Sequence, residues 1–188
     1  MTIWQDIKAG TIPARLTVDE VYDLTAAGVL HEGAHFELID GEIVPMAAAK
    51  ANWHDQMATK LIRALVRALP DTLRLHVEAS VTLDIGTLLE PDLAVWPAGL
   101  LTRDVRGADL ALVIEVADSS LPYDLRVKAP LYARFGVRDY WVVDAVRQTI
   151  RVHRGAVDGR YTDVDEYEAH QPVATLEAGV TVRLDQLD

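Results

Sequence analysis

Three charged residues in the middle of the chain have the types and spacing that phosphodiester hydrolysis requires. Asp92 follows a proline at the start of one apolar segment, and Glu115 stands within a second apolar segment. Lys128 lies on the helix predicted to follow that second segment. Two carboxylates on neighbouring strands can hold a hard divalent cation, and a nearby lysine can orient water or stabilise phosphate charge. This pattern predicts a metal-assisted hydrolytic site.

Glu115 gives the clearest of these signals because the residues around it, over 112–116, are otherwise apolar. A carboxylate buried among such side chains must be paired, protonated or bound to a cation, since burying an unpaired charge is costly. A buried salt bridge to Arg126 or Lys128 is the alternative interpretation. Asp92 alone would be interpreted as a turn residue, but the pair of carboxylates favours a metal site.

Asp124 and His54 are candidates for supporting roles. Asp124 precedes Lys128 by four positions, so the two share a helix face, and Asp124 would hold the lysine in place. An ordinary surface ion pair, worth little, is the alternative. His54 lies in the first turn of a predicted helix, where a hydrogen-bonded structural histidine is more common than a metal ligand.

Glu78 and Glu37 are candidates for a further acidic contact to the metal. Glu78 lies on the polar face of a long alternating segment, where it fits both a third metal ligand and a solvated side chain. Glu37 opens a predicted hairpin and could reach the metal through water or face solvent. The residues alone leave both alternatives open.

The predicted elements that position these residues give a mixed α/β layer, a central sheet flanked by helices. Thr17 and Glu20 form a capping box, and Asp40-Gly41 favours a type I′ hairpin turn. Pro130 conflicts with the last predicted helix, because proline lacks a backbone donor and favours a kink or a later start. The predicted segments are helices over 18–27, 53–69 and 124–135, a hairpin over 36–44, and strands over 73–84, 93–96, 110–116, 140–143, 149–153, 173–175 and 180–184.

Composition places the chain among ordinary globular proteins. Its 188 residues favour one domain over 1–188, with the acidic C-terminal strands of 155–188 part of it or appended to it. The chain has no cysteine, which excludes disulfides and thiolate zinc sites. It shows no apolar run long enough for a membrane and no signal peptide, so a cytoplasmic protein is expected. The net charge of −11 weighs against tight non-specific DNA binding, although a bound cation would offset part of it.

Several segments in a fixed order together resemble the Uma-type restriction endonuclease family, a branch of the PD-(D/E)xK nuclease superfamily. The resemblance covers most of the chain, roughly from Thr17 to Arg154. The ordered series carries it, and the hairpin alone would be a weak signal. The segments are 36–42, His54, 90–95, 112–116, 123–124, Lys128, 132–137 and 139–144.

The resemblance implies a restriction-endonuclease-like core in the order αβββαβ and a site for Mg²⁺ or Mn²⁺. By motif, Asp92 and Glu115 take the two acidic positions, and Glu37 matches an acidic residue that often joins the site. The residue two after Glu115 is Ala117, where the parent motif has lysine, so Lys128 looks like a replacement from the next helix. DNA is the implied substrate, and a homodimer is expected because superfamily nucleases that cut both strands usually act in pairs.

Two other functions remain open from the sequence. A catalytically silent module could keep the nuclease fold and bind a protein or nucleic-acid partner, and the acidic charge favours that interpretation. Hydrolysis of RNA or another phosphoester would use the same site chemistry, so the residues do not separate it from DNA cleavage.

Overall fold

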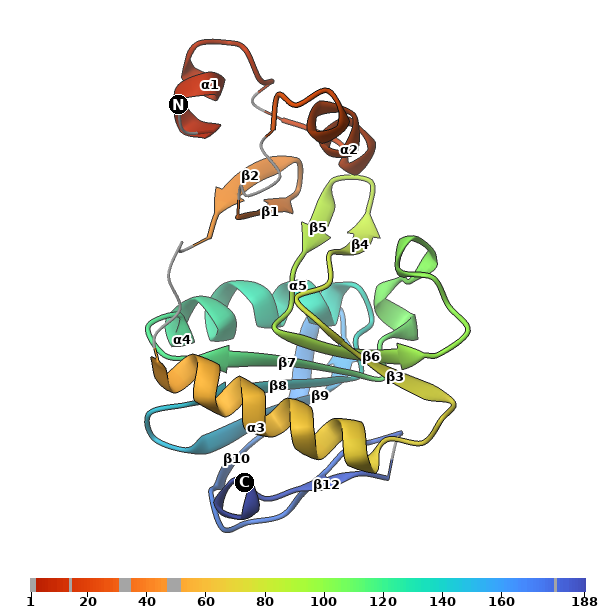
Figure 1. The fold of residues 1–188 in the computed structure, drawn as a ribbon, viewed down its shortest axis with the longest axis vertical. Coiled ribbons are helices and arrows are strands. Elements are labelled where there is room, and N and C mark those ends of the chain that lie inside the picture. The colour runs from red at the N-terminus through yellow and green to blue at the C-terminus, as the bar shows by residue number, and fades with distance from the viewer. Residues whose placement is uncertain (1–2, 14, 31–34, 47–51, 178) are drawn as a thin grey trace. The chain divides into compact units, whose positions relative to one another are not determined.

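The chain folds into two compact units, which are described one at a time (Figure 1). The computed structural model describes all residues except 1–2, 14, 31–34, 47–51 and 178. The four-stranded unit comprises residues 1–49 and 80–90, and the six-stranded unit comprises residues 50–79 and 91–188. The expectation of one domain over 1–188 stays a prediction. Within the described ranges, no helix is long and apolar enough to cross a membrane.

The four-stranded unit is an antiparallel sheet in the order β2-β1-β5-β4 with two helices. Its core is formed by apolar side chains that include Leu16, Val21, Leu38 and Ile43. Its elements are α1 (Ile3–Lys8), α2 (Val18–Ala26), β1 (Phe36–Ile39), β2 (Glu42–Pro45), β4 (Val81–Asp84) and β5 (Thr87–Leu89).

The local signals in this unit are confirmed. Thr17 caps α2: its hydroxyl accepts a hydrogen bond from the Glu20 amide, and the Glu20 carboxylate accepts one from the Thr17 amide. Asp40 and Gly41 have φ angles of 49° and 82°, so both adopt the left-handed conformation that a type I′ turn requires. The predicted helix start and hairpin are therefore determined by short-range chemistry.

The six-stranded unit is a mixed sheet in the order β10-β9-β8-β7-β6-β3, in which β7 and β8 run parallel and the other neighbours antiparallel. Its strands are β3 (Leu73–Val77), β6 (Leu93–Pro97), β7 (Leu112–Ala117), β8 (Asp139–Asp144), β9 (Thr149–Val157) and β10 (Arg160–Glu168), with a separate pair of β11 (Val173–Ala174) and β12 (Thr181–Val182). Its helices are α3 (Asn52–Ala68), α4 (Leu121–Tyr123), the π-helical segment η3 (Asp124–Lys128) and α5 (Ala129–Arg134), with short 3₁₀ turns at Thr102–Asp104, Gly107–Asp109 and Leu184–Gln186.

Helices cover both faces of this sheet, as the mixed α/β prediction expected. Figure 1 shows α3 on one side of the strands and α5 on the other. Met57, Leu61 and Leu65 follow the helical spacing of α3 and pack with apolar side chains of the strands. All six residues of β7 are buried, which confirms that this strand is central in the sheet.

The prediction of one long strand over 73–84 is wrong. The segment divides into β3, which pairs with β6, and β4, which pairs with β5 in the other unit. Glu78 lies at the break with a φ of 50°, a conformation that ends an extended strand. Alternating polarity cannot reveal such a break, because two short strands keep the same period of two as one long strand.

The segment around Pro130 also differs from the predicted continuous helix. The chain forms α4, then η3, and then α5, with Pro130 in the first turn of α5, where a missing backbone donor costs nothing. The Ala129 amide donates to the Asp124 carbonyl, five residues back, which closes the π turn. The proline thus coincides with a change of helix type.

The C-terminal segment contains a strand that the sequence analysis missed. β10 pairs with β9 along its whole length and forms one edge of the six-stranded sheet. Its acidic side chains Asp163, Asp165 and Glu166 lie on an exposed strand, where burial periodicity is weak. The two strands predicted near 173–175 and 180–184 exist, but they pair with each other and do not extend the main sheet.

Candidate active site

Asp92 and Glu115 come together where β6 begins beside β7. The antiparallel register pairs Leu93 with Ile114, so the next positions bring Asp92 opposite Glu115. The Val116 amide donates to Asp92 Oδ2 at 2.8 Å, and the Asp92 amide lies 3.5 Å from Glu115 Oε2. The predicted pair of carboxylates on neighbouring strands is therefore present in this unit.

Lys128 reaches Glu115 from the helical segment that follows β7. Its Nζ donates to Glu115 Oε1 at 2.9 Å, and the two residues are only 4% and 3% exposed. Burial of this kind makes the carboxylate and the ammonium depend on each other, because either charge left alone would be costly. The structure thus contains both the proximity on which the catalytic hypothesis depends and the buried ion pair that was its alternative.

Tyr132 also contacts the carboxylate of Glu115, and the sequence analysis did not select it. Its hydroxyl donates to the same oxygen, Oε1, at 3.0 Å, and the residue is fully buried. The only sequence signal was its position four residues after Lys128, which places both side chains on one helical face. In the sequence alone, this spacing is the same as that of ordinary core residues on a helix. Only the contact with Glu115 in the structure distinguishes Tyr132 from them.

His54 lies within hydrogen-bond distance of Asp92, and its supporting role in the site stays a prediction. It lies in the first turn of α3, and its Nε2 is 3.0 Å from Asp92 Oδ1. Its Nδ1 is 3.3 Å from Asp55 Oδ1. Asp92 is thereby held by a backbone amide on one oxygen and an imidazole on the other.

Asp124 is buried at the start of η3, the segment that ends at Lys128. Tyr132 lies on α5, the helix that follows directly. Its carboxylate accepts a hydrogen bond from the Ser120 hydroxyl at 2.7 Å. Its carbonyl accepts one from the Tyr140 hydroxyl at 3.1 Å, in addition to the bond that closes the π turn. These contacts anchor the helical segment, and a direct hold of Asp124 on Lys128 stays a prediction.

Glu37 and Glu78 have different surroundings. Glu37 is buried in β1 of the four-stranded unit, and its Oε1 lies 3.4 Å from the Glu90 amide. Glu78 is exposed, and its amide donates to the Asp92 carbonyl at 3.1 Å. The described residues contain no group of three or more His, Asp or Glu side chains placed to hold a metal ion. The metal roles of Glu37 and Glu78 stay predictions.

An aromatic cluster lies beside Tyr132 and includes two groups with shifted acidity. The ring of Tyr140 lies 4.8 Å from that of Tyr132 and 5.3 Å from that of His153, and Tyr161 is the fourth member. Burial lowers the pKa of His153, and burial together with the Asp139 charge raises the pKa of Tyr161. The cluster is an apolar support for the helical segment that carries Lys128.

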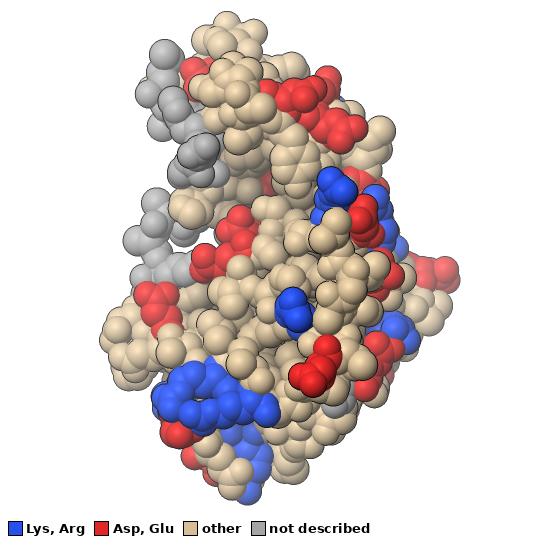
Figure 2. All heavy atoms as spheres, turned by 45° about the vertical axis from the view of Figure 1, so that its right-hand side comes forward, with Lys and Arg blue, Asp and Glu red and all other residues tan. Residues whose placement is uncertain are grey.

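Three basic side chains on α3 are exposed and lie near the last residues of the chain. Lys60 donates to the Leu187 carbonyl at 3.1 Å, and Arg63 and Arg67 each lie 3.7 Å from the Asp188 carboxylate. On the face drawn in Figure 2, one compact group of Lys and Arg stands out, and several acidic groups stand apart from it. The net charge of −11 disfavours broad electrostatic binding of nucleic acid.

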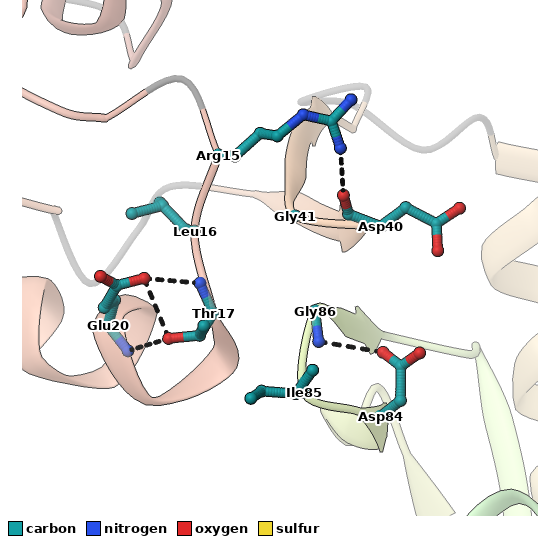
Figure 3. A pocket seen from close by; sticks show the side chains of 9 residues that line it. All are labelled: Arg15, Leu16, Thr17, Glu20, Asp40, Gly41, Asp84, Ile85 and Gly86. Atoms are coloured by element: carbon teal, nitrogen blue, oxygen red, sulfur yellow. Dashed lines mark hydrogen bonds between the residues drawn. The ribbon is translucent and has the colours of Figure 1, made fainter.

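The four-stranded unit contains an open pocket that holds none of the candidate site residues (Figure 3). Arg15 crosses its rim and donates to the Asp40 carbonyl at 2.8 Å and to the Glu42 carboxylate at 2.6 Å. The turns at Gly41 and Gly86 form the facing side. The Glu20 carboxylate accepts a hydrogen bond from the Thr17 hydroxyl, and the Asp84 carboxylate accepts one from the Gly86 amide.

The fold defines a class of protein: an α/β protein with a central mixed sheet flanked by helices, in which two carboxylates meet on adjacent strands and a lysine reaches one of them from the following helical segment. A structure described as "a putative nuclease belonging to DUF820" from Anabaena variabilis ATCC 29413 is similar in fold, with a TM-score of 0.71 and 15% sequence identity. The match covers 90% of this chain and 96% of that one. No curated protein matched the chain.

The family follows from the sequence. The model of the Uma2 family, described as "Putative restriction endonuclease", matches residues 18–185. The chain therefore belongs to the Uma2 family, and the family resemblance noted in the sequence is confirmed.

Proposed function

We propose that the protein is a divalent-metal-dependent endonuclease that hydrolyses DNA phosphodiester bonds with Asp92, Glu115 and Lys128. One observation carries the proposal: Lys128 Nζ lies 2.9 Å from Glu115 Oε1 and the Asp92 backbone amide lies 3.5 Å from Glu115 Oε2, so the three residues meet where β6 begins beside β7. Membership of a restriction endonuclease family supports a nuclease-type function. The metal, the DNA substrate and the role of each residue belong to the proposal.

The donor chemistry of the site fits Mg²⁺ or Mn²⁺. Asp92 and Glu115 offer carboxylate oxygens, the hard donors that these ions prefer. Mg²⁺ keeps several of its waters and is commonly bound through one or two carboxylates, so it needs no cage of three protein ligands. A site of two carboxylates is therefore sufficient, and Glu37, through water, or Glu78 would add a further acidic contact.

Each residue has a distinct task in this proposal. A bound divalent cation would supply Lewis-acid polarisation of the scissile phosphate. Asp92 and Glu115 would hold it, and His54 would keep the Asp92 carboxylate oriented. A lysine ammonium has three donors, so Lys128 can bind Glu115 and at the same time a water or a phosphate oxygen. That reach would let Lys128 replace the lysine of the parent motif, whose position holds Ala117.

The first test is calorimetric titration with Mn²⁺ and Mg²⁺ of the wild type, Asp92→Ala and Glu115→Ala. We expect the wild type to bind and both variants to lose binding. Asp185→Ala, which removes an exposed carboxylate paired with Arg183, is the matched control and should bind like the wild type. A wild type that binds neither ion would contradict the proposal.

The second test is cleavage of supercoiled, linear and single-stranded DNA in the presence of Mn²⁺. Glu115→Gln and Lys128→Met should each lower the rate by about 10²–10³-fold, the usual cost of losing one group that stabilises transition-state charge. Cleavage by Glu115→Gln at the wild-type rate would refute the assignment. Parallel assays with RNA separate DNA hydrolysis from hydrolysis of another phosphoester.

A homodimer is the assembly that we propose for double-strand cleavage, because one such site cuts one strand. Sedimentation or light scattering should give twice the chain mass of 20.7 kDa without DNA, and that mass plus the mass of the duplex with DNA. A monomer on DNA that still makes double-strand breaks would contradict this assembly.

A catalytically silent module is the second candidate function, and the net charge of −11 is the observation that favours it. In this alternative, Glu115 and Lys128 form only a structural ion pair. It predicts that Glu115→Gln and Lys128→Met together retain partner binding and that the wild type cuts no nucleic acid with any divalent ion. DNA cleavage lost in Glu115→Gln would exclude it.

A further inference from the structure

We propose that Tyr132 is a positioning residue of the candidate active site, which together with Lys128 fixes the direction in which the Glu115 carboxylate faces Asp92. This inference rests on the proposed function, because the orientation of the Glu115 carboxylate matters for binding a cation between it and Asp92. Its basis is that both donors meet the same oxygen. The Tyr132 hydroxyl and Lys128 Nζ lie 3.0 Å and 2.9 Å from Glu115 Oε1.

The two donors together distinguish one carboxylate oxygen from the other. A carboxylate oxygen has two lone pairs in the carboxylate plane, and Oε1 meets a separate donor for each of them. The other oxygen, Oε2, is the one turned toward Asp92, whose amide lies 3.5 Å away. Rotation of the Glu115 carboxylate out of its plane would break both contacts at Oε1, so the pair of donors fixes that plane and keeps the second oxygen on the side of Asp92.

Tyr132 is suited to this task because its ring is held on several sides. The residue is fully buried, and its ring packs against Tyr140 with a centroid distance of 4.8 Å and an interplanar angle of 41°. Tyr140 is itself tied to the helical segment, since its hydroxyl donates to the Asp124 carbonyl at 3.1 Å. A phenol ring so confined can present its hydroxyl in only a narrow range of positions.

Lys128 alone would not fix the orientation of the Glu115 carboxylate as narrowly. A lysine ammonium is a compact charge on a flexible stem, so it attracts either oxygen of a carboxylate almost equally. The Tyr132 hydroxyl is a neutral donor on a rigid frame, so it selects one oxygen and leaves the negative charge of Glu115 available to a cation. The two residues therefore divide the work: Lys128 balances charge, and Tyr132 sets orientation.

The variant Tyr132→Phe removes this single hydroxyl and keeps the ring that packs on Tyr140. Tyr161→Phe is the matched control: it removes a hydroxyl from the same aromatic cluster, but that hydroxyl donates to the Val137 carbonyl at 2.9 Å. Mn²⁺ titration should show at least about tenfold weaker binding for Tyr132→Phe, as expected for the loss of one hydrogen bond to a charged carboxylate, and wild-type binding for Tyr161→Phe. In DNA cleavage, kcat should fall for Tyr132→Phe while KM for DNA stays unchanged.

Crystal structures of the wild type and of Tyr132→Phe give a readout that needs neither metal nor activity. The proposal predicts one Glu115 carboxylate orientation in the wild type and a rotated or multiple orientation in the variant. An unchanged Glu115 orientation in Tyr132→Phe, or Mn²⁺ binding equal to that of the wild type, would overturn the positioning role.

The Mn²⁺ titration and the crystal structures together distinguish a failure of this inference from a failure of the proposed function. A wild type that binds no Mn²⁺ refutes the metal-dependent function, and the Glu115 orientation in Tyr132→Phe still decides whether the hydroxyl positions that carboxylate. Equal loss of Mn²⁺ binding in Tyr132→Phe and Tyr161→Phe would assign the effect to general packing of the cluster and would also overturn the positioning role.

Discussion

The carboxylates of Asp92 and Glu115 are each met by a backbone amide of the neighbouring strand segment. The Val116 amide binds the Asp92 carboxylate at 2.8 Å, and the Asp92 amide lies 3.5 Å from the Glu115 carboxylate. The position of each carboxylate is therefore set by a backbone amide of the opposite strand segment. A slip of one residue in the pairing of β6 with β7 would turn Glu115 to the other face of the sheet, so the candidate site depends on strand register.

The ion pair of Lys128 with Glu115 should be important for stability as well as for chemistry. We expect Lys128→Met to lower the free energy of unfolding by about 3–5 kcal/mol, because it leaves a buried carboxylate without its cation. The double variant Lys128→Met/Glu115→Gln should recover part of that loss, since neither charge then remains. Urea unfolding of the single and double variants measures both effects.

Arg15→Met is the control for this stability prediction. Arg15 pairs with Glu42, but both side chains are more than half exposed. Its loss should therefore cost no more than about 1 kcal/mol, as is usual for surface ion pairs. Equal costs for Arg15→Met and Lys128→Met would contradict the view that the buried pair is a special feature.

His54 should contribute to metal binding without contacting the metal. His54→Ala removes the imidazole that lies 3.0 Å from Asp92 Oδ1, so the Asp92 carboxylate loses an orienting contact. We expect about tenfold weaker Mn²⁺ binding, in the range found when residues that orient metal ligands are removed. His170→Ala, at an exposed position, should bind like the wild type, and calorimetry compares the two. An unchanged affinity in His54→Ala would show that Asp92 is oriented without the imidazole.

Gly107 should tolerate no larger residue, because a Cβ atom there would meet the backbone and the Cβ atom of Phe135, the latter at 2.8 Å. Phe135 ends α5, so the displacement would act on the helix that carries Tyr132. We expect Gly107→Ala to lower stability by about 1–3 kcal/mol, as overpacking does, and to weaken Mn²⁺ binding. Gly99→Ala, where a Cβ atom has open space, is the control. Thermal unfolding with equal midpoints for both variants would contradict this prediction.

His153 should make the protein less stable in mild acid. Burial lowers its pKa below the ordinary value of 6.5, so the unfolded chain binds its proton more readily than the folded chain does. Stability from this group is therefore fully present above pH 6.5 and is lost as pH falls below that value toward the folded pKa. His153→Phe should flatten the dependence between pH 7.5 and pH 5, measured by urea unfolding, and His170→Gln should not. A slope that His153→Phe leaves unchanged would assign the acid sensitivity to other groups.

Much of the fold could be predicted because its signals are local. The capping box at Thr17, the Asp40-Gly41 turn and the apolar run of β7 each depend on residues close in sequence, and the structure confirms all three. The strand break at Glu78 and the strand β10 were missed because polarity patterns do not report which strand pairs with which. Strand partners are set by contacts between residues far apart in the chain.

The candidate site divides in the same way. By itself, the sequence determined that Asp92, Glu115 and Lys128 were the residues to consider, because charged side chains beside apolar strands need a partner. Only the tertiary structure decided that His54 meets Asp92, that η3 changes the helix type before Pro130, and that Tyr132 shares an oxygen of Glu115 with Lys128. The physical reason is that a hydrogen bond needs atoms placed within a few tenths of an ångström, and only the packing of the sheet and helices sets positions that finely.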